Sequence, residues 1–112
     1  MKRFALGRLP PGAMNKTEAR YDAHLALLKH AGQILWYRFE AIKLRLADNT
    51  FYTADFFVMV ADGTLEVHEV KGYWEDDARV KIKVAADQYP FRFRAFKAEA
   101  LKHGGGWVAE EF

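Results

Sequence analysis

The sequence predicts a mixed α/β fold of the α+β type, with the element order helix, three strands, helix, strand. Three observations support this prediction. Residues 15–30 carry apolar side chains at helical spacing, residues 34–71 are rich in β-branched and aromatic residues between turn signals, and residues 75–96 contain a second helix followed by a strand. We therefore expect a mixed central sheet flanked by helices.

The first helix is expected over residues 15–30, with Asn15 or Thr17 as its cap and Gly32 as its stop. Its apolar stripe consists of Tyr21, Leu25 and Leu28. One turn before this stripe lies Glu18, so its carboxylate falls on the core-facing side of the helix. Two interpretations stay open, an acid that interacts with the helix dipole and a metal ligand, and the helix alone favours the first.

The strand region begins with residues 34–47, where the parity of the apolar positions changes near residues 40–41 and predicts a bulge. Residues 48–49 indicate a turn, and residues 50–60 have the composition of a central strand. The next strand is expected over residues 65–71. Together these segments predict a three-stranded meander.

The second helix is expected over residues 75–89, with acids in its first turn and Pro90 as its stop. Residues 91–96, FRFRAF, alternate aromatic residues with arginine and predict a half-exposed strand. After a short helical stretch and the glycines at 104–106, the placement of residues 107–112 stays open.

The length of 112 residues suits a single domain over residues 15–112, preceded by a flexible basic arm over residues 1–14. Because the chain has no cysteine, disulfides and thiolate metal sites are excluded, and a reducing cytoplasm is the expected compartment. No apolar run reaches the roughly 20 residues that cross a bilayer, so no membrane partner is expected. The net charge of +2 says little by itself about partners.

Charged side chains continue the apolar faces of two neighbouring strands. In the strand that ends HEVKG, Glu69 and Lys71 share the parity of Val67. Asp55, within TADFFVMV, shares the parity of Phe57. Burying a charge is costly unless it is paired or binds a metal. These residues therefore form either a structural ion-pair cluster or a functional site.

The loop between these strands decides whether Asp55 faces Glu69. A two-residue loop would put the two acids on opposite faces of the sheet. A three-residue loop over residues 61–63, with Gly63 in the left-handed conformation, would place them directly opposite each other. We predict this second register.

Facing carboxylates with Cβ atoms about 5 Å apart repel each other, and a divalent cation between them relieves the repulsion. Oxygen ligands without cysteine favour Mg²⁺ or Mn²⁺ over Zn²⁺. The four histidines are scattered, and His68 lies on the opposite parity from Glu69, so no histidine ligand is expected. The expected cofactor is therefore Mg²⁺ or Mn²⁺.

These residues also match a known pattern. Asp55, thirteen intervening residues and Glu-Val-Lys at 69–71, preceded by a helix bearing Glu18, resemble the PD-(D/E)xK nuclease superfamily. The segments KTEARYDAHL, ADFFV, ADG, EVKGYW and ARVKIK are similar to a family of small phage and prophage endonuclease-like proteins within it. The layout is also similar to phage endonuclease I and Holliday junction resolvases. The resemblance covers about residues 16–97, and Ala54 stands where the superfamily name has a proline that many members lack.

The resemblance implies a restriction-endonuclease-like αβββαβ core and a metal-dependent endonuclease that hydrolyses DNA phosphodiester bonds, acting on branched or flapped DNA. It implies that Asp55, Glu69 and the backbone carbonyl of Val70 hold the metal. Glu18 would complete this site or a second one, and Lys71 would orient or help to deprotonate the attacking water. It also implies a phage or prophage protein in the cytoplasm of a bacterial host.

Four further residues are expected to contact DNA. Lys81 and Lys83 on the second helix would meet backbone phosphates, and Tyr73 and Trp74 would stack on an unpaired base or form the rim of the site. A solvated basic helix face and aromatic packing at a strand exit are the open alternatives. A homodimer is a further expectation, since a two-fold partner would let two sites cut two strands.

Two other interpretations of the whole chain stay open. The first is a non-catalytic nucleic-acid-binding or assembly module that keeps the nuclease fold, and the second is a structural ion-pair cluster. A chain that no longer catalyses hydrolysis could lose any of its catalytic residues. The presence of the complete catalytic set therefore favours hydrolysis. That set consists of Glu18, Asp55, Glu69 and Lys71.

Overall fold

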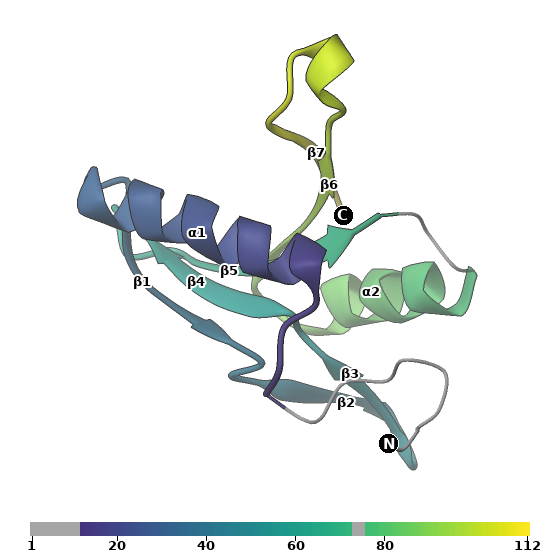
Figure 1. Ribbon diagram of the computed structural model, residues 1–112. Helices are drawn as coiled ribbons and strands as arrows, with labels where there is room; N and C mark the ends of the chain where they lie inside the picture. The colour runs from purple at the N-terminus through teal and green to yellow at the C-terminus, as the bar shows by residue number, and fades with distance from the viewer. Residues whose placement is uncertain (1–11, 73–75) are drawn as a thin grey trace.

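The computed structural model describes residues 12–72 and 76–112 (Figure 1). Within these residues the helices are α1 (Lys16–His30), α2 (Asp76–Gln88) and a short 3-10 helix, η2 (Leu101–His103). The strands are β1 (Ile34–Phe39), β2 (Lys43–Ala47), β3 (Thr50–Thr53), β4 (Phe56–Val60), β5 (Leu65–Lys71), β6 (Arg92–Ala98) and β7 (Trp107–Glu111). Most of the expected basic arm, together with Tyr73 and Trp74, lies outside the described residues.

The main sheet has five strands in the order β1-β4-β5-β6-β7. β5 and β6 run parallel and are joined through α2, whereas the other neighbours pair antiparallel. Strands β2 and β3 form a separate two-stranded sheet. Figure 1 shows α1 over one face of the main sheet, with α2 and the β2-β3 hairpin on the other side. The predicted α+β class, a mixed sheet flanked by helices, is therefore confirmed.

An apolar cluster lies on each face of the main sheet. The cluster beneath α1 consists of Tyr21, Leu25, Ile34, Phe56, Val58, Val70 and Phe96. The cluster between the sheet, α2 and the β2-β3 hairpin consists of Leu44, Tyr52, Ala54, Val67, Ile82, Ala85 and Phe93. Because β5 contributes to both clusters, it is the buried centre of the fold, and its residues 66–70 are all buried.

Helix α1 begins with a reciprocal capping box. The Asn15 side chain accepts a hydrogen bond from the Glu18 N–H at 2.8 Å, and the Glu18 carboxylate accepts one from the Asn15 N–H at 2.9 Å. Tyr21 and Leu25 are fully buried against the sheet, and Leu28 packs at the edge of the same cluster. The expected cap and apolar stripe are both confirmed.

The prediction of one continuous strand over residues 50–60 is wrong. Residues 34–60 form one long hairpin in which β1 pairs with β4 and β2 with β3, and both of its arms are interrupted at the same level. Where a bulge was predicted near residues 40–41, the strand instead ends at Phe39 and a new one begins at Lys43, and the register shifts lie at 34–36 and 45–47. Glu40 has φ of +50° in this break, and its N–H donates to the carbonyl of Asp55 at 2.8 Å. The bend lets the outer half of the hairpin pack against α2, and it places Asp55 at the corner.

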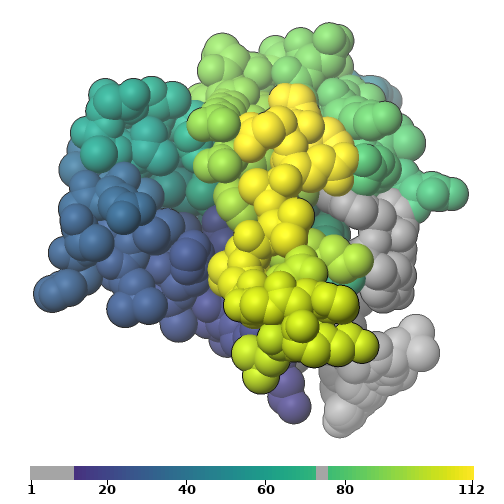
Figure 2. Space-filling model, turned by 90° about the horizontal axis from the view of Figure 1, so that it is seen from above, coloured from purple at the N-terminus to yellow at the C-terminus, as the bar shows by residue number. Residues whose placement is uncertain are grey.

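The C-terminal residues, whose placement the sequence left open, form the edge strand β7. It pairs antiparallel with β6, and the Phe112 N–H donates to the Phe93 carbonyl at 3.0 Å. In Figure 2 this segment, drawn in yellow, runs across one face of the molecule beside the green atoms of α2. β6 is therefore an interior strand that continues to Ala98, rather than a half-exposed strand ending at Phe96.

The predicted hairpin register between β4 and β5 is confirmed. Phe56 pairs with His68 and Met59 with Leu65, and the Val60 N–H donates to the Thr64 carbonyl at 2.9 Å. The loop is therefore residues 61–63.

Substitutions at Gly63, the loop residue in the left-handed conformation, test this register. Its φ is +91°, and a Cβ added there meets no atom within 4 Å, so an alanine would suffer only the backbone penalty. Gly63→Ala is expected to lower the free energy of unfolding in urea by about 1–2 kcal/mol. Gly63→Asn should lose much less, because asparagine tolerates this conformation. Equal stability of Gly63→Ala and the parent chain would contradict the assigned loop.

Candidate functional site

Two carboxylates face each other where β4 meets the bend of the hairpin. Extending the β4-β5 register by one residue beyond Phe56 and His68 places Asp55 directly opposite Glu69. Glu69 is 6% exposed and Asp55 is partly buried. Burial raises the pKa of Asp55 to about 8, and the neighbouring Glu69 carboxylate adds to the increase. Burial and the facing carboxylate therefore both favour the protonated form of Asp55.

Three donors compensate part of this negative charge. The Tyr52 hydroxyl donates to Glu69 Oε1 at 2.6 Å, and Lys71 Nζ lies 3.0 Å from Glu69 Oε2. The Val70 N–H donates to Asp55 Oδ2 at 2.8 Å, which lowers the pKa of Asp55 but does not cancel the effect of burial. Burial and the charge of Glu69 raise the pKa of Tyr52, so this hydroxyl remains a hydrogen-bond donor. The arrangement fixes both carboxylates in place.

Glu18 lies near this pair but is held at the start of α1. Its charge raises the pKa of Asp55, which shows that the two carboxylates interact, while its own oxygen accepts the Asn15 N–H. Among residues 12–72 and 76–112, no three His, Asp or Glu side chains gather closely enough to hold a metal ion. The structure thus brings Asp55, Glu69 and Lys71 together and leaves Glu18 in its capping role.

The chemistry of the donor set fits a hard divalent cation. Magnesium is usually bound through one or two carboxylates, with waters and substrate phosphates completing its shell. Asp55 and Glu69 are such a pair, and both lie on the face that carries Val67 and Phe57. The Val70 N–H is hydrogen-bonded to Asp55, whereas metal binding by the Val70 carbonyl stays a prediction.

One comparison with known proteins gives a match. A family described as "Protein of unknown function (DUF1064)" matches residues 14–105. The chain belongs to this DUF1064 family. The matched range contains Glu18, Asp55, Glu69 and Lys71. No curated protein and no solved structure matches the chain.

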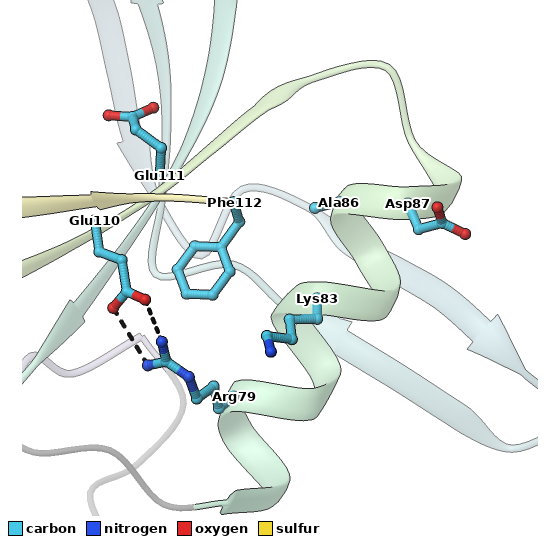
Figure 3. Close-up of a pocket in the computed structure, with 7 residues that line it drawn as sticks. All are labelled: Arg79, Lys83, Ala86, Asp87, Glu110, Glu111 and Phe112. Atoms are coloured by element: carbon cyan, nitrogen blue, oxygen red, sulfur yellow. Dashed lines mark hydrogen bonds and ion pairs between the residues drawn. The ribbon is translucent and has the colours of Figure 1, made fainter.

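The two lysines of α2 lie on different sides of this DUF1064 protein. Lys81 lines a cavity of about 290 Å³ that also reaches Glu69. Lys83 lines another cavity, of about 500 Å³, beside the C-terminal residues. Figure 3 shows the second cavity, where Arg79 reaches Glu110 and the Phe112 ring lies next to them. Only Lys81 therefore adjoins the two-acid site.

A second buried polar group, which the sequence did not reveal as a group, lies on the α1 face. His68 Nε2 is 2.8 Å from Glu66 Oε1, and the Tyr21 hydroxyl is 2.7 Å from His68 Nδ1. Burial lowers the pKa of His68. The sequence signal was the shared parity of Glu66 and His68 with Val70, opposite to that of Glu69.

The arginines of β6 neutralise this second group. Arg92 and Arg94 lie 3.3 and 3.4 Å from Glu66 oxygens, and both also pair with Glu111 of β7. The half-exposed strand predicted over residues 91–96 therefore fits Arg92, whose side chain is 52% exposed, better than Arg94, whose side chain is 24% exposed. Arg94 is covered because β7 pairs with β6, and the sequence did not predict this neighbouring strand.

No helix within the described ranges of the DUF1064 chain is both long and apolar enough to span a membrane.

The raised pKa of Asp55 predicts how stability depends on pH. The folded-state pKa is about 8 and the ordinary value is 3.8, so the protonated carboxyl stabilises the fold fully below pH 4, and this contribution is lost as the pH rises to 8. Asp55→Asn, measured by urea unfolding in EDTA, should flatten this fall and should be more stable than the parent at pH 8. Asp48→Asn, at an exposed turn, is the matched control. Parallel pH profiles of parent and Asp55→Asn would contradict the assignment.

Proposed function

We propose that this DUF1064 protein is a Mg²⁺- or Mn²⁺-dependent endonuclease that hydrolyses DNA phosphodiester bonds. Asp55 and Glu69 would bind the metal, and Lys71 would act beside it. The observation that carries the proposal is the facing pair of carboxylates on adjacent strands, with the Lys71 ammonium 3.0 Å from Glu69.

The charge balance supports a functional site over a structural ion-pair cluster. Within the described part of the chain, the ion pair recorded for the two acids is the one from Lys71 to Glu69. Two carboxylates beside one ammonium carry an excess of negative charge, and the Glu69 charge adds to burial in raising the pKa of Asp55. A structural cluster would be expected to balance its charges, as Glu66 and Glu111 do with Arg92 and Arg94.

The residues of the site suit phosphodiester hydrolysis. A bound Mg²⁺ would activate a water and neutralise charge on the phosphate oxygens. Lys71, whose side chain is 24% exposed, can reach a substrate while it keeps its contact with Glu69. Its ammonium is a compact positive charge that orients a water or a phosphate oxygen. Tyr52 fixes one oxygen of Glu69, so that the other oxygen faces Lys71.

The finer parts of the proposal come from the resemblance to the PD-(D/E)xK superfamily. They are action on branched or flapped DNA, a homodimer with two sites, and a place in the cytoplasm of a phage host. Glu18 would act in this proposal through its charge on Asp55, since its carboxylate is engaged by Asn15.

The second candidate is a non-catalytic nucleic-acid-binding or assembly module. It is favoured by one observation, that the described residues contain no group of three metal-binding side chains. Such a module would keep the basic side chains of α2 and the sheet without turnover.

Cleavage assays separate the two candidates. The full chain is incubated with linear, flapped and four-way-junction DNA in Mg²⁺, Mn²⁺ or EDTA. We expect metal-dependent cleavage that falls about 100-fold or more in Asp55→Ala and in Lys71→Ala, because each removes a group that acts at the reacting phosphate.

Lys102→Ala is the matched control, since Lys102 is exposed on the short helix η2 and lines neither of the two cavities beside α2, and it should cleave at nearly the parent rate. Binding to these DNAs without cleavage under either metal would refute hydrolysis and support the module.

A further inference from the structure

A cavity opens beside Glu69, between the β2-β3 hairpin and α2. Its volume is about 290 Å³. Its lining residues are Phe51, Tyr52, Thr53, Glu69, Ala78 and Lys81. Figure 1 shows the hairpin and α2 on the same side of the main sheet, and the two pack against each other. The cavity is therefore continuous with the two-acid site through Glu69.

The hairpin side of this cavity carries an exposed aromatic ring. Tyr52 points inward and is 5% exposed, whereas Phe51, its neighbour on the same strand, is 38% exposed. The Lys43 ammonium lies 4.6 Å from the centroid of the Phe51 ring, and Arg45 pairs directly with Phe51 across the hairpin. An aromatic face accompanied by cations is the combination that binds single-stranded nucleic acid, through base stacking and phosphate contacts.

The helix side of the cavity adds a further cation. Lys81 is exposed and lines the cavity on α2, facing the hairpin. Lys81 is the cation among the lining residues, and Glu69 is the acid. A phosphate of a nucleic-acid strand would therefore be bound by the Lys81 ammonium and repelled by the Glu69 carboxylate.

We propose that this cavity is a binding subsite for one unpaired nucleotide of the substrate strand. The base stacks on Phe51, and a phosphate lies beside Lys81. The inference rests on the proposed function, because Glu69 joins the subsite to the proposed cleavage centre. It assigns the substrate class as DNA with a single-stranded stretch next to the bond that is cut. The volume admits a single nucleotide unit rather than a duplex, since it lies at the lower end of the range of ligand pockets, about 300–1,000 Å³.

The first test measures binding in EDTA, where no metal-dependent cleavage occurs. Anisotropy of fluorescein-labelled single-stranded DNA and of blunt duplex DNA is titrated with the full chain. Phe51→Leu keeps an apolar side chain but removes the stacking face, and it should bind single strands about tenfold more weakly while its affinity for duplex DNA stays unchanged. Phe51→Tyr keeps the ring and should bind like the parent.

The second test compares a lysine of the cavity with an exposed lysine elsewhere. Lys81→Ala should reduce the dependence of log affinity for single strands on log salt concentration by about 0.7, the loss of one phosphate contact. Lys102→Ala, on the short helix η2 and outside the lining of the cavity, should keep the parent slope. Thermal unfolding of each variant checks that it is folded.

The outcomes separate the subsite from the hydrolysis on which it rests. If the parent chain cleaves DNA but Phe51→Leu binds single strands as tightly as the parent, the subsite is refuted and the endonuclease stands. The subsite is also refuted if the parent binds no single strand, or if Lys81→Ala and Lys102→Ala behave alike. Binding that depends on Phe51 and Lys81 without any cleavage in Mg²⁺ or Mn²⁺ would uphold the nucleotide-binding subsite and refute the endonuclease.

Discussion

Repulsion between Asp55 and Glu69 is the constraint on which the site depends. The two acids are placed opposite each other by the β4-β5 register, and the register follows from a three-residue loop with Gly63 in the left-handed conformation. A carboxylate inside a protein is costly, and a second one facing it raises that cost. The Tyr52 hydroxyl, the Lys71 ammonium and a backbone N–H offset part of it. The remainder is the charge that a divalent cation would balance.

The charges of the buried carboxylates are balanced differently on the two faces of the sheet. On the α1 face, Glu66 is surrounded by His68, Arg92 and Arg94, so a carboxylate that is 3% exposed has its charge balanced by the protein itself. On the α2 face, the Lys71 ammonium pairs with Glu69, and Asp55 faces Glu69 across the two strands. The bend in the long hairpin also lies on this second side, and it lets β2 and β3 fold toward α2 and form the cavity next to Glu69. The excess charge and the accessible space therefore occur together on one face.

The sequence predicted the parts of the structure that are encoded locally. Periodicity and capping located α1, and the turn residues at 61–63 gave the register that brings Asp55 opposite Glu69. The tertiary partners could not be predicted in this way. Tyr52 reaches Glu69 only because the hairpin bends at residues 54–55, and Glu66 is neutralised by arginines from a strand that follows α2. The place of β7 also depends on long-range pairing, which a weakly patterned tail does not reveal.

One shared cation between Asp55 and Glu69 is the central claim, and calorimetric titration of Mn²⁺ tests it most directly. The parent chain, Asp55→Asn, Glu69→Gln and the double variant are compared as a double-mutant cycle, which isolates the coupling between the two positions. The account predicts one Mn²⁺ per parent chain, a large loss of affinity in each single variant, and little further loss in the double variant, because both acids hold the same ion. Independent, additive losses, or no Mn²⁺ binding by the parent chain, would contradict it.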